Sequence, residues 1–311
     1  MLARIREILA AYWEAFGGKM KRREFVALAG AALAGAAMHG RKVSGSPLGL
    51  PFGYQAWELA PDMMKDWDGT LRAMKEYGYS YIDLNQVSPY TDRPAADLKA
   101  SFASHGFTFS NALWSYPAFA NTFDKTVADS LTLGLSTIVC SPRPRLRTSD
   151  DWKNFAEELN RYGQRTKAAG LQLGYHNHEI EFVKTPQGDV PWDIVMQSTD
   201  PSLVRFQLDV GNCTFGGGNP YEYLAKYSAR YYGVHVKDLK PGKAAVPVGS
   251  GDLDWKRIFT LVKAAGIRNI VAEVGAYAVS TLQGQPLAPP DYSVLEMYKR
   301  SADFLKAYSE V

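Results

Sequence analysis

Several features that would identify a function directly are missing from this chain of 311 residues. It has two cysteines, Cys140 and Cys213, and no CxxC pair, so it carries no disulfide framework. We expect two buried free thiols rather than one disulfide bond between them. No GxGxxG or Walker sequence follows an apolar run, which removes the usual reason to expect a nucleotide-binding open sheet. The formal charge is +3, with no basic stripe in the body of the chain, which argues against a nucleic-acid partner.

The N-terminal extension, residues 1–46, predicts an export signal and a linker rather than a part of the fold. A basic start at residue 20 is followed by an apolar stretch, Phe25–Met38, that ends in an A-x-A cleavage pattern. This stretch is shorter than the ~20 residues that a membrane span needs. The pair Arg22–Arg23 resembles a twin-arginine signal. We therefore expect a periplasmic protein that meets the membrane only through this signal. The alternative is an N-terminal amphipathic or anchoring helix on a cytoplasmic protein.

From residue 47 to residue 311 the chain alternates short apolar runs with longer helical patterns. The runs are nearly continuous, which is typical of strands that are covered on both faces. They are Phe52–Trp57, Tyr79–Leu84, Phe107–Trp114, Thr137–Cys140, Leu171–His176, Val204–Val210, Tyr232–Val236 and Asn269–Val274. The helical patterns include Asp66–Gly78, Asp150–Gly170, Pro220–Arg230, Leu253–Gly266 and Asp291–Tyr308. Eight such units with short connections predict a single-domain α/β protein, a (β/α)8 TIM barrel.

Polar residues gather where the last four predicted strands end. The fifth strand ends in His176-Asn177-His178-Glu179-Ile180-Glu181, and the others end near Asp209, His235 and Glu273. Each residue alone has an ordinary explanation, such as a helix cap or a salt bridge. Catalytic groups of barrels lie at the carboxyl ends of the strands, so these carboxylates and imidazoles should converge. The pattern predicts one divalent ion, such as Mn²⁺, Mg²⁺, Co²⁺ or Zn²⁺.

Aromatic residues also fall at or just beyond the strand ends. They are Trp57, Trp114, Tyr116, Phe182 and Phe215. Their rings either stack on a sugar ring or pack as an apolar cap on the barrel mouth. We take Trp57 and Trp114, together with Asn212 after the sixth strand, as candidates for substrate binding.

Five segments carry a resemblance to a known family. YHNHEIEF, FQLDVGN, VHVKD, VGSGDLDW and VAEV resemble the sugar phosphate isomerase/epimerase family of xylose isomerase-like barrels, over about residues 53–305. The resemblance implies a metal ion held by a glutamate of the fifth-strand loop, then by Asp209, His235 and Glu273. For the first ligand we prefer Glu181 to Glu179.

The resemblance also implies roles around the ion. His176 and His178 would line the pocket, and Lys237 would touch a substrate oxygen. Lys237 follows His235 by two residues, a spacing that returns a side chain to the same face of a strand. The chain departs from the family pattern at Ser250, which replaces a common glutamate, and after Glu273, where Val274 and Gly275 replace polar residues.

Enzymes of this family move a proton next to a carbonyl group. A metal ion lowers the pKa of the C–H bond, and carboxylates remove and return the proton. Glu181 and Glu273 would be the proton carriers, and Lys237 and His178 would stabilise the charge that develops. Three classes stay open: a sugar or keto-sugar isomerase or epimerase, a 3-keto-glycoside lyase or hydrolase, and a non-catalytic carbohydrate-binding barrel. The expected partner is a small carbohydrate, and a homo-oligomer is left open.

Overall fold

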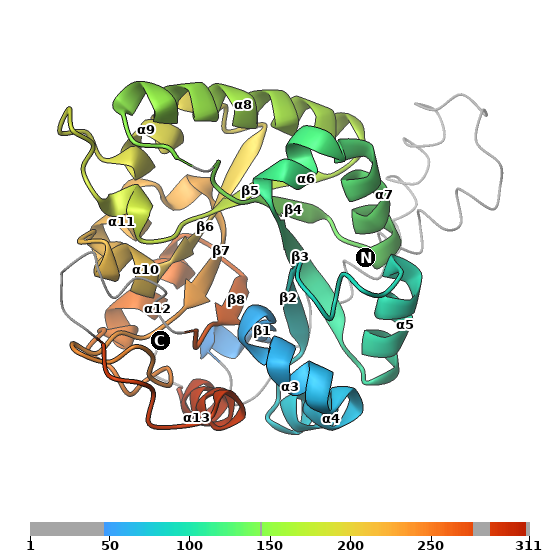
Figure 1. Ribbon diagram of the computed structural model, residues 1–311. Coiled ribbons are helices and arrows are strands. Elements are labelled where there is room, and N and C mark those ends of the chain that lie inside the picture. The colour runs from blue at the N-terminus through green and yellow to red at the C-terminus, as the bar shows by residue number, and fades with distance from the viewer. Residues whose placement is uncertain (1–46, 144, 276–286, 309–311) are drawn as a thin grey trace, which may run out of the picture. The chain divides into compact units, whose positions relative to one another are not determined.

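The strands close into a parallel barrel (Figure 1). The computed structural model describes residues 47–143, 145–275 and 287–308, so the predicted export signal lies outside the described residues. Each strand pairs with the next, and β8 pairs back onto β1. The strands are β1 (Gly53–Gln55), β2 (Tyr81–Asn85), β3 (Thr108–Trp114), β4 (Thr137–Cys140), β5 (Gln172–His176), β6 (Val204–Asp209), β7 (Tyr231–Val236) and β8 (Asn269–Ala272). The predicted (β/α)8 barrel is confirmed.

Helices surround the strands and cover the outer face of the barrel (Figure 1). The α-helices are α3 (Ala60–Lys65), α4 (Trp67–Glu76), α5 (Ala95–Ser104), α6 (Tyr116–Asn121), α7 (Phe123–Leu133), α8 (Ser149–Ala168), α9 (Pro191–Ser198), α10 (Val210–Phe215), α11 (Pro220–Lys226), α12 (Trp255–Ala264) and α13 (Val294–Ala307). The 3-10 turns are η1 (Pro47–Gly49), η2 (Trp57–Leu59), η3 (Ile180–Phe182) and η4 (Ser228–Arg230). In the described ranges, no helix combines the length and the apolar character needed to cross a membrane.

Local signals explain where the main helices begin and end. Helix α8 starts at a capping box, in which the Thr148 side chain and the Asp151 side chain each accept from the other residue's backbone N–H. After that helix, Gly170 adopts a φ of 82°, a left-handed conformation that glycine takes without strain. Asp254 caps α12 by accepting from the backbone of Arg257. These helices therefore match the predicted segments to within a few residues.

Several predicted boundaries differ from the structure by a few residues, and two of the differences have a clear local cause. The sixth strand ends at Asp209 rather than Val210, because the Asp209 carboxylate accepts from Asn212 N and so starts α10 immediately. The helix predicted over 220–230 is α11 followed by the separate turn η4. In both places the apolar pattern of the sequence continues, but a side-chain cap or a turn ends the strand or helix.

The side chains of β5 show which residues face into the barrel. The Tyr175 ring packs on Phe155 of α8 and on Trp192 of α9, so it points outward to the helices. Because side chains alternate along a strand, His176 points inward. Cys140 and Cys213 are buried free thiols, as predicted.

The barrel interior contains a layer of polar side chains that join opposite strands. The Gln207 amide of β6 donates to Asp83 of β2, at 3.0 Å. The Asn111 amide of β3 donates to the Tyr232 hydroxyl of β7, also at 3.0 Å. Contacts between strands this far apart around the barrel can only cross its interior. Interiors of such barrels are usually filled by branched apolar side chains, so this polar layer needs a functional explanation.

Candidate metal centre

Four buried side chains converge at the carboxyl ends of β5, β6, β7 and β8. His176, Asp209, His235 and Glu273 each offer one ligand atom, and these atoms all lie within 4.8 Å of one another. The four residues are at most 6% exposed. Ligand atoms of a single ion lie about 2.0–2.2 Å from it when they are nitrogen or oxygen, so a small contraction would bring this set into coordination distance. Two imidazoles and two carboxylates suit a borderline divalent ion.

Two of these groups have buried polar atoms without a hydrogen-bond partner. They are Oδ2 of Asp209 and Nδ1 of His176, for which the described part of the chain offers no donor or acceptor. Burial, followed by the negative charge of Glu273, raises the pKa of Asp209 well above its usual range. Buried polar atoms are nearly always satisfied, and an unsatisfied one points to a missing ion or water. The residues therefore fit a metal ion.

Glu273 is the most strongly paired member of the cluster. Its Oε2 lies 2.6 Å from His235 Nδ1, and its Oε1 accepts from Lys237 Nζ at 2.8 Å. Burial opposes its ionisation, but the charge of Lys237 and the contact with His235 outweigh burial and hold the pKa of Glu273 well below its usual range. The predicted inward position of Lys237, two residues after His235, agrees with this contact.

The fifth-strand ligand differs from the expectation, because the cluster contains His176 where Glu181 was expected. Glu181 is fully buried, but its Oε1 accepts from the Tyr175 hydroxyl at 2.6 Å and its Oε2 accepts from His178 N at 3.0 Å. Since Tyr175 faces the helices, the Glu181 carboxylate lies on the outer side of β5. The chain turns into η3 after His176, so residue spacing no longer decides which side chain points inward. Glu179 is not in the cluster either.

The remaining predicted site residues lie around these four. The His178 ring lies 5.3 Å from the His176 ring, edge to face, and its Nδ1 is buried without a partner among the described residues. Asn212 is buried, and its backbone N–H donates to Asp209 Oδ1 at 2.8 Å, so it supports a cluster member. A contact of His178 or Asn212 with substrate stays a prediction.

The two tryptophans proposed for substrate binding occupy different environments. Trp57 begins η2 after β1 and is 53% exposed, so its ring is accessible, and its contact with substrate stays a prediction. Trp114 is buried in the hydrophobic core and pairs in register with Cys140, which in turn pairs with the outward-facing Tyr175. Paired residues of neighbouring strands point to the same side, so Trp114 also faces the helices. The structure therefore corrects the expectation for Trp114, because the strand's alternation turns its side chain away from the pocket.

Asp238, in the VHVKD segment, is a structural residue of the seventh-strand loop. Its Oδ2 accepts from Gly249 N at 2.8 Å, from Gly251 N at 2.9 Å and from the Trp255 indole at 2.9 Å. This buried carboxylate thus ties the VGSGDLDW segment to the end of β7. Ser250, one of the two departures from the family pattern, is an exposed residue within that segment.

Two residues of the site were missed by sequence reasoning. Asp83 of β2 lies 2.6 Å from Nε2 of His235. Glu58 follows β1 and accepts from the Tyr298 hydroxyl at 3.2 Å. Burial and then the charge of Glu273 raise the pKa of Glu58 to about 7, against the opposing effect of Lys237.

The second departure from the family pattern makes room for Glu58. A side chain at Gly275 would collide with Glu58 Oε1. The small residue after the eighth strand therefore leaves space for a carboxyl group from the first loop. No local signal in the sequence relates positions that are so far apart in the chain.

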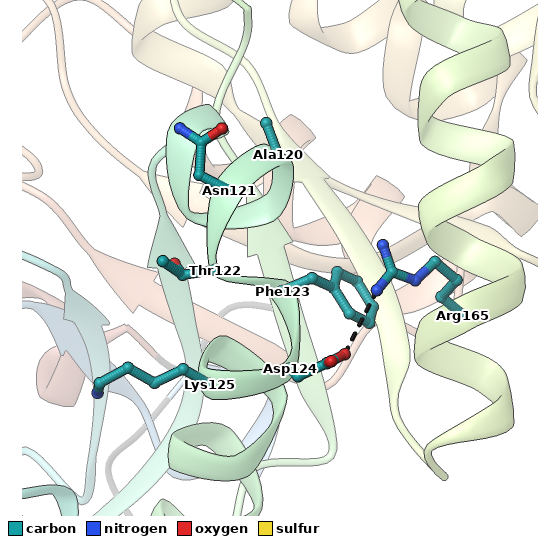
Figure 2. Close-up of a pocket in the computed structure, with 7 residues that line it drawn as sticks. All are labelled: Ala120, Asn121, Thr122, Phe123, Asp124, Lys125 and Arg165. Carbon is teal, nitrogen blue, oxygen red and sulfur yellow. Dashed lines mark hydrogen bonds and ion pairs between the residues drawn. The ribbon is translucent and has the colours of Figure 1, made fainter.

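A separate hollow of about 310 Å³ lies on the outer surface, where α6, the start of α7 and α8 meet (Figure 2). The guanidinium of Arg165 covers the ring of Phe123 at 3.7 Å and pairs with Asp124 at 3.3 Å. The charged groups of that pair are exposed and satisfy each other. None of the cluster residues lines this hollow, so it is not the candidate active site.

A family model described as the xylose isomerase-like TIM barrel matches residues 71–308. The chain is 32% identical over 134 residues to an inosose dehydratase of Clostridium tetani, a match that covers 37% of this chain and 44% of that protein. It is 28% identical over 162 residues to an inosose dehydratase of Bacillus cereus, covering 46% and 51%. The matches thus span about half the length of these curated relatives or less.

Solved structures share the whole barrel. A sugar phosphate isomerase/epimerase from Parabacteroides distasonis superposes with a TM-score of 0.70 and 25% identity, over 82% of this chain and 97% of that one. An L-ribulose 3-epimerase superposes with a TM-score of 0.63 and 16% identity, over 83% and 94% of the two chains. The second likeness shows the fold alone.

Proposed function

Because the chain belongs to the xylose isomerase-like TIM barrel family, we propose that it is a divalent-metal-dependent enzyme that removes a proton next to a carbonyl group. The substrate class is a cyclic keto-polyol or keto-sugar, and elimination of water is the reaction that we favour. The observation that carries the proposal is the buried cluster of His176, Asp209, His235 and Glu273, with Lys237 bound to one of its carboxylates.

His176, Asp209, His235 and Glu273 would hold the ion. When bound, a divalent ion acts as a Lewis acid that polarises a substrate carbonyl and makes the neighbouring C–H bond more acidic. Glu273 is the base that we assign to this proton, since its carboxylate belongs to the cluster and contacts both His235 and Lys237. Glu181, on the outer side of β5, is not available for that role.

Lys237 would stabilise the negative charge that develops on the substrate oxygen. Its ammonium group is almost fully buried and lies 2.8 Å from Glu273, which supports this role. In an elimination, the C–H bond and the C–O bond of the next carbon break, a C=C bond forms, and the departing hydroxyl takes up a proton to leave as water. Glu58, whose pKa Glu273 and Lys237 both influence, is a further carboxyl group at this site.

Elimination is favoured because the curated relatives are inosose dehydratases. Epimerisation is the second candidate, because it needs the same proton removal and the chain shares its barrel with a sugar phosphate isomerase/epimerase. The two reactions diverge only after the proton has been removed. Elimination then loses the neighbouring hydroxyl group, whereas epimerisation returns a proton to the opposite face.

The test uses the full chain, analysed for metal and reconstituted with Mn²⁺, Mg²⁺, Co²⁺ or Zn²⁺ in turn. Each preparation is incubated in D2O with a keto-inositol, a 3-keto-glucoside or a free ketose, and followed by NMR and ultraviolet absorbance. Deuterium next to the carbonyl supports proton removal, an enone absorbance identifies elimination, and a deuterated epimer identifies epimerisation. Glu273→Gln is the matched control and should abolish exchange. Absence of exchange with every ion and every substrate would contradict the proposal.

A further inference from the structure

Asp83 places a carboxyl group in the interior of the barrel, where apolar side chains are usual. It lies in the middle of β2 and is 2% exposed. Its side chain contacts Gln207 of β6 and His235 of β7, so it reaches across the interior. Burying a carboxylate is unfavourable unless hydrogen bonds or charges compensate. The proposed reaction gives Asp83 no role, so its place in the barrel calls for another explanation.

The two ring nitrogens of His235 face two different carboxylates. Nδ1 lies 2.6 Å from Oε2 of Glu273, and Nε2 lies 2.6 Å from Oδ2 of Asp83. Glu273 belongs to the group of converging ligand atoms, and Asp83 does not. The Nδ1 edge of the ring is therefore the edge that faces the ion position, and the Nε2 edge faces away from it.

This arrangement decides which nitrogen can bind the ion. A metal-bound imidazole uses the lone pair of one nitrogen and keeps its proton on the other. With Nδ1 toward the ion, the proton stays on Nε2. The Asp83 carboxylate then accepts a hydrogen bond from this N–H group. Gln207 donates to the same carboxylate oxygen at 3.0 Å and so fixes its orientation.

We propose that Asp83 is a positioning residue of the metal centre, which holds the His235 ring with Nδ1 toward the ion by accepting a hydrogen bond from Nε2. Such partners fix the tautomer and the orientation of a ligand histidine, and their loss typically weakens metal binding by about 10–100-fold. Asp83 acts through His235 and does not contact the ion. The inference rests on the use of the cluster for an ion that the proposed function assumes, and not on the reaction.

The test measures ion affinity rather than turnover. Metal-free wild-type protein, Asp83→Leu and Asp83→Asn are titrated with Co²⁺ and with Zn²⁺ in competition with a chelator. Asp83→Leu should bind about 10–100-fold more weakly. Asp83→Asn keeps an oxygen acceptor and should recover most of the affinity. Circular dichroism and thermal unfolding establish that each variant is folded.

A double-mutant cycle tests whether Asp83 acts through His235. Asp83→Leu should have little further effect on affinity in a His235→Ala background. Equal weakening in both backgrounds would overturn the proposal, as would wild-type affinity in Asp83→Leu.

Nitrogen-15 NMR of the Zn²⁺-loaded wild-type protein provides a test that needs no variant. It should show the His235 proton on Nε2, and a proton on Nδ1 would overturn the proposal. A wild-type chain that binds no divalent ion contradicts both this proposal and the proposed function. A chain that binds an ion but turns over no keto compound contradicts the proposed function alone.

Discussion

Replacing Glu181 and His176 one at a time separates a structural carboxylate from a metal ligand. Sequence resemblance favours Glu181 as the ligand, whereas the structure brings His176 to the cluster. Glu181→Gln keeps the shape of the side chain and one acceptor oxygen. The two hydrogen bonds now made by the carboxylate, from the Tyr175 hydroxyl and from His178 N, cannot both be kept unchanged by an amide.

The size of the effect can be worked out from these contacts. A hydrogen bond to a charged group contributes about 1.5–3 kcal/mol to stability. Burial raises the pKa of Glu181, which means that burial destabilises its charged form. Removing the charge therefore offsets part of the hydrogen-bond energy that the substitution loses. We therefore expect Glu181→Gln to lower the free energy of unfolding by about 2 kcal/mol, or roughly 4–8 °C in Tm. Its affinity for a divalent ion should change by less than about threefold, because the carboxylate lies outside the barrel.

His176→Leu should show the opposite pattern. The Nδ1 atom of His176 has no hydrogen-bond partner among the described residues, so replacing the ring with an apolar side chain should cost the metal-free protein little stability. The ion, however, would lose one of four ligands. Loss of a residue that only supports a ligand typically weakens metal binding by roughly 10–100-fold. We expect the affinity of His176→Leu for Co²⁺ to fall by more than this.

Both variants are measured by Co²⁺ titration followed by absorbance and by thermal unfolding of the metal-free proteins. The wild-type protein and Glu179→Gln are the controls, since Glu179 lies in the same loop but outside the cluster. A tenfold or greater loss of Co²⁺ affinity in Glu181→Gln, with His176→Leu unchanged, would refute this assignment. In that case Glu181 would turn inward when the ion binds.

Three further predictions concern the loop after β7 and the N-terminal segment. Lys237→Ala should retain its metal content, but its turnover should fall by roughly 10²-fold, as is typical when one group that stabilises a developing negative charge is lost. If the variant instead loses the ion, Lys237 has a structural role through its ion pair with Glu273. Asp238→Asn should lower the free energy of unfolding in urea by about 2 kcal/mol, because the part-buried Gly249 N–H and the buried Trp255 indole N–H share a carboxylate acceptor. An unchanged unfolding midpoint would contradict its role in tying this segment to β7. A reporter fused to residues 20–46 should be exported, and continued export after both Arg22 and Arg23 are changed to Lys would exclude the twin-arginine route.

The sequence alone determined the barrel and much of its site. Apolar runs and helical patterns arise from residues close together in the chain, so they predicted the order of strands and helices correctly. Asp209, His235 and Glu273 stand at the carboxyl ends of predicted strands, and this position predicts that they converge. These three do converge in the structure.

Only the tertiary structure decided the parts that depend on turns or on contacts across the barrel. After β5 the chain turns, and the contact with Tyr175 holds Glu181 on the outer side while His176 faces the ion position. Asp83 meets His235 although 152 positions separate them in the chain. Strand periodicity specifies the face of a side chain only while the strand continues, and no local pattern specifies which residues the closed barrel brings together.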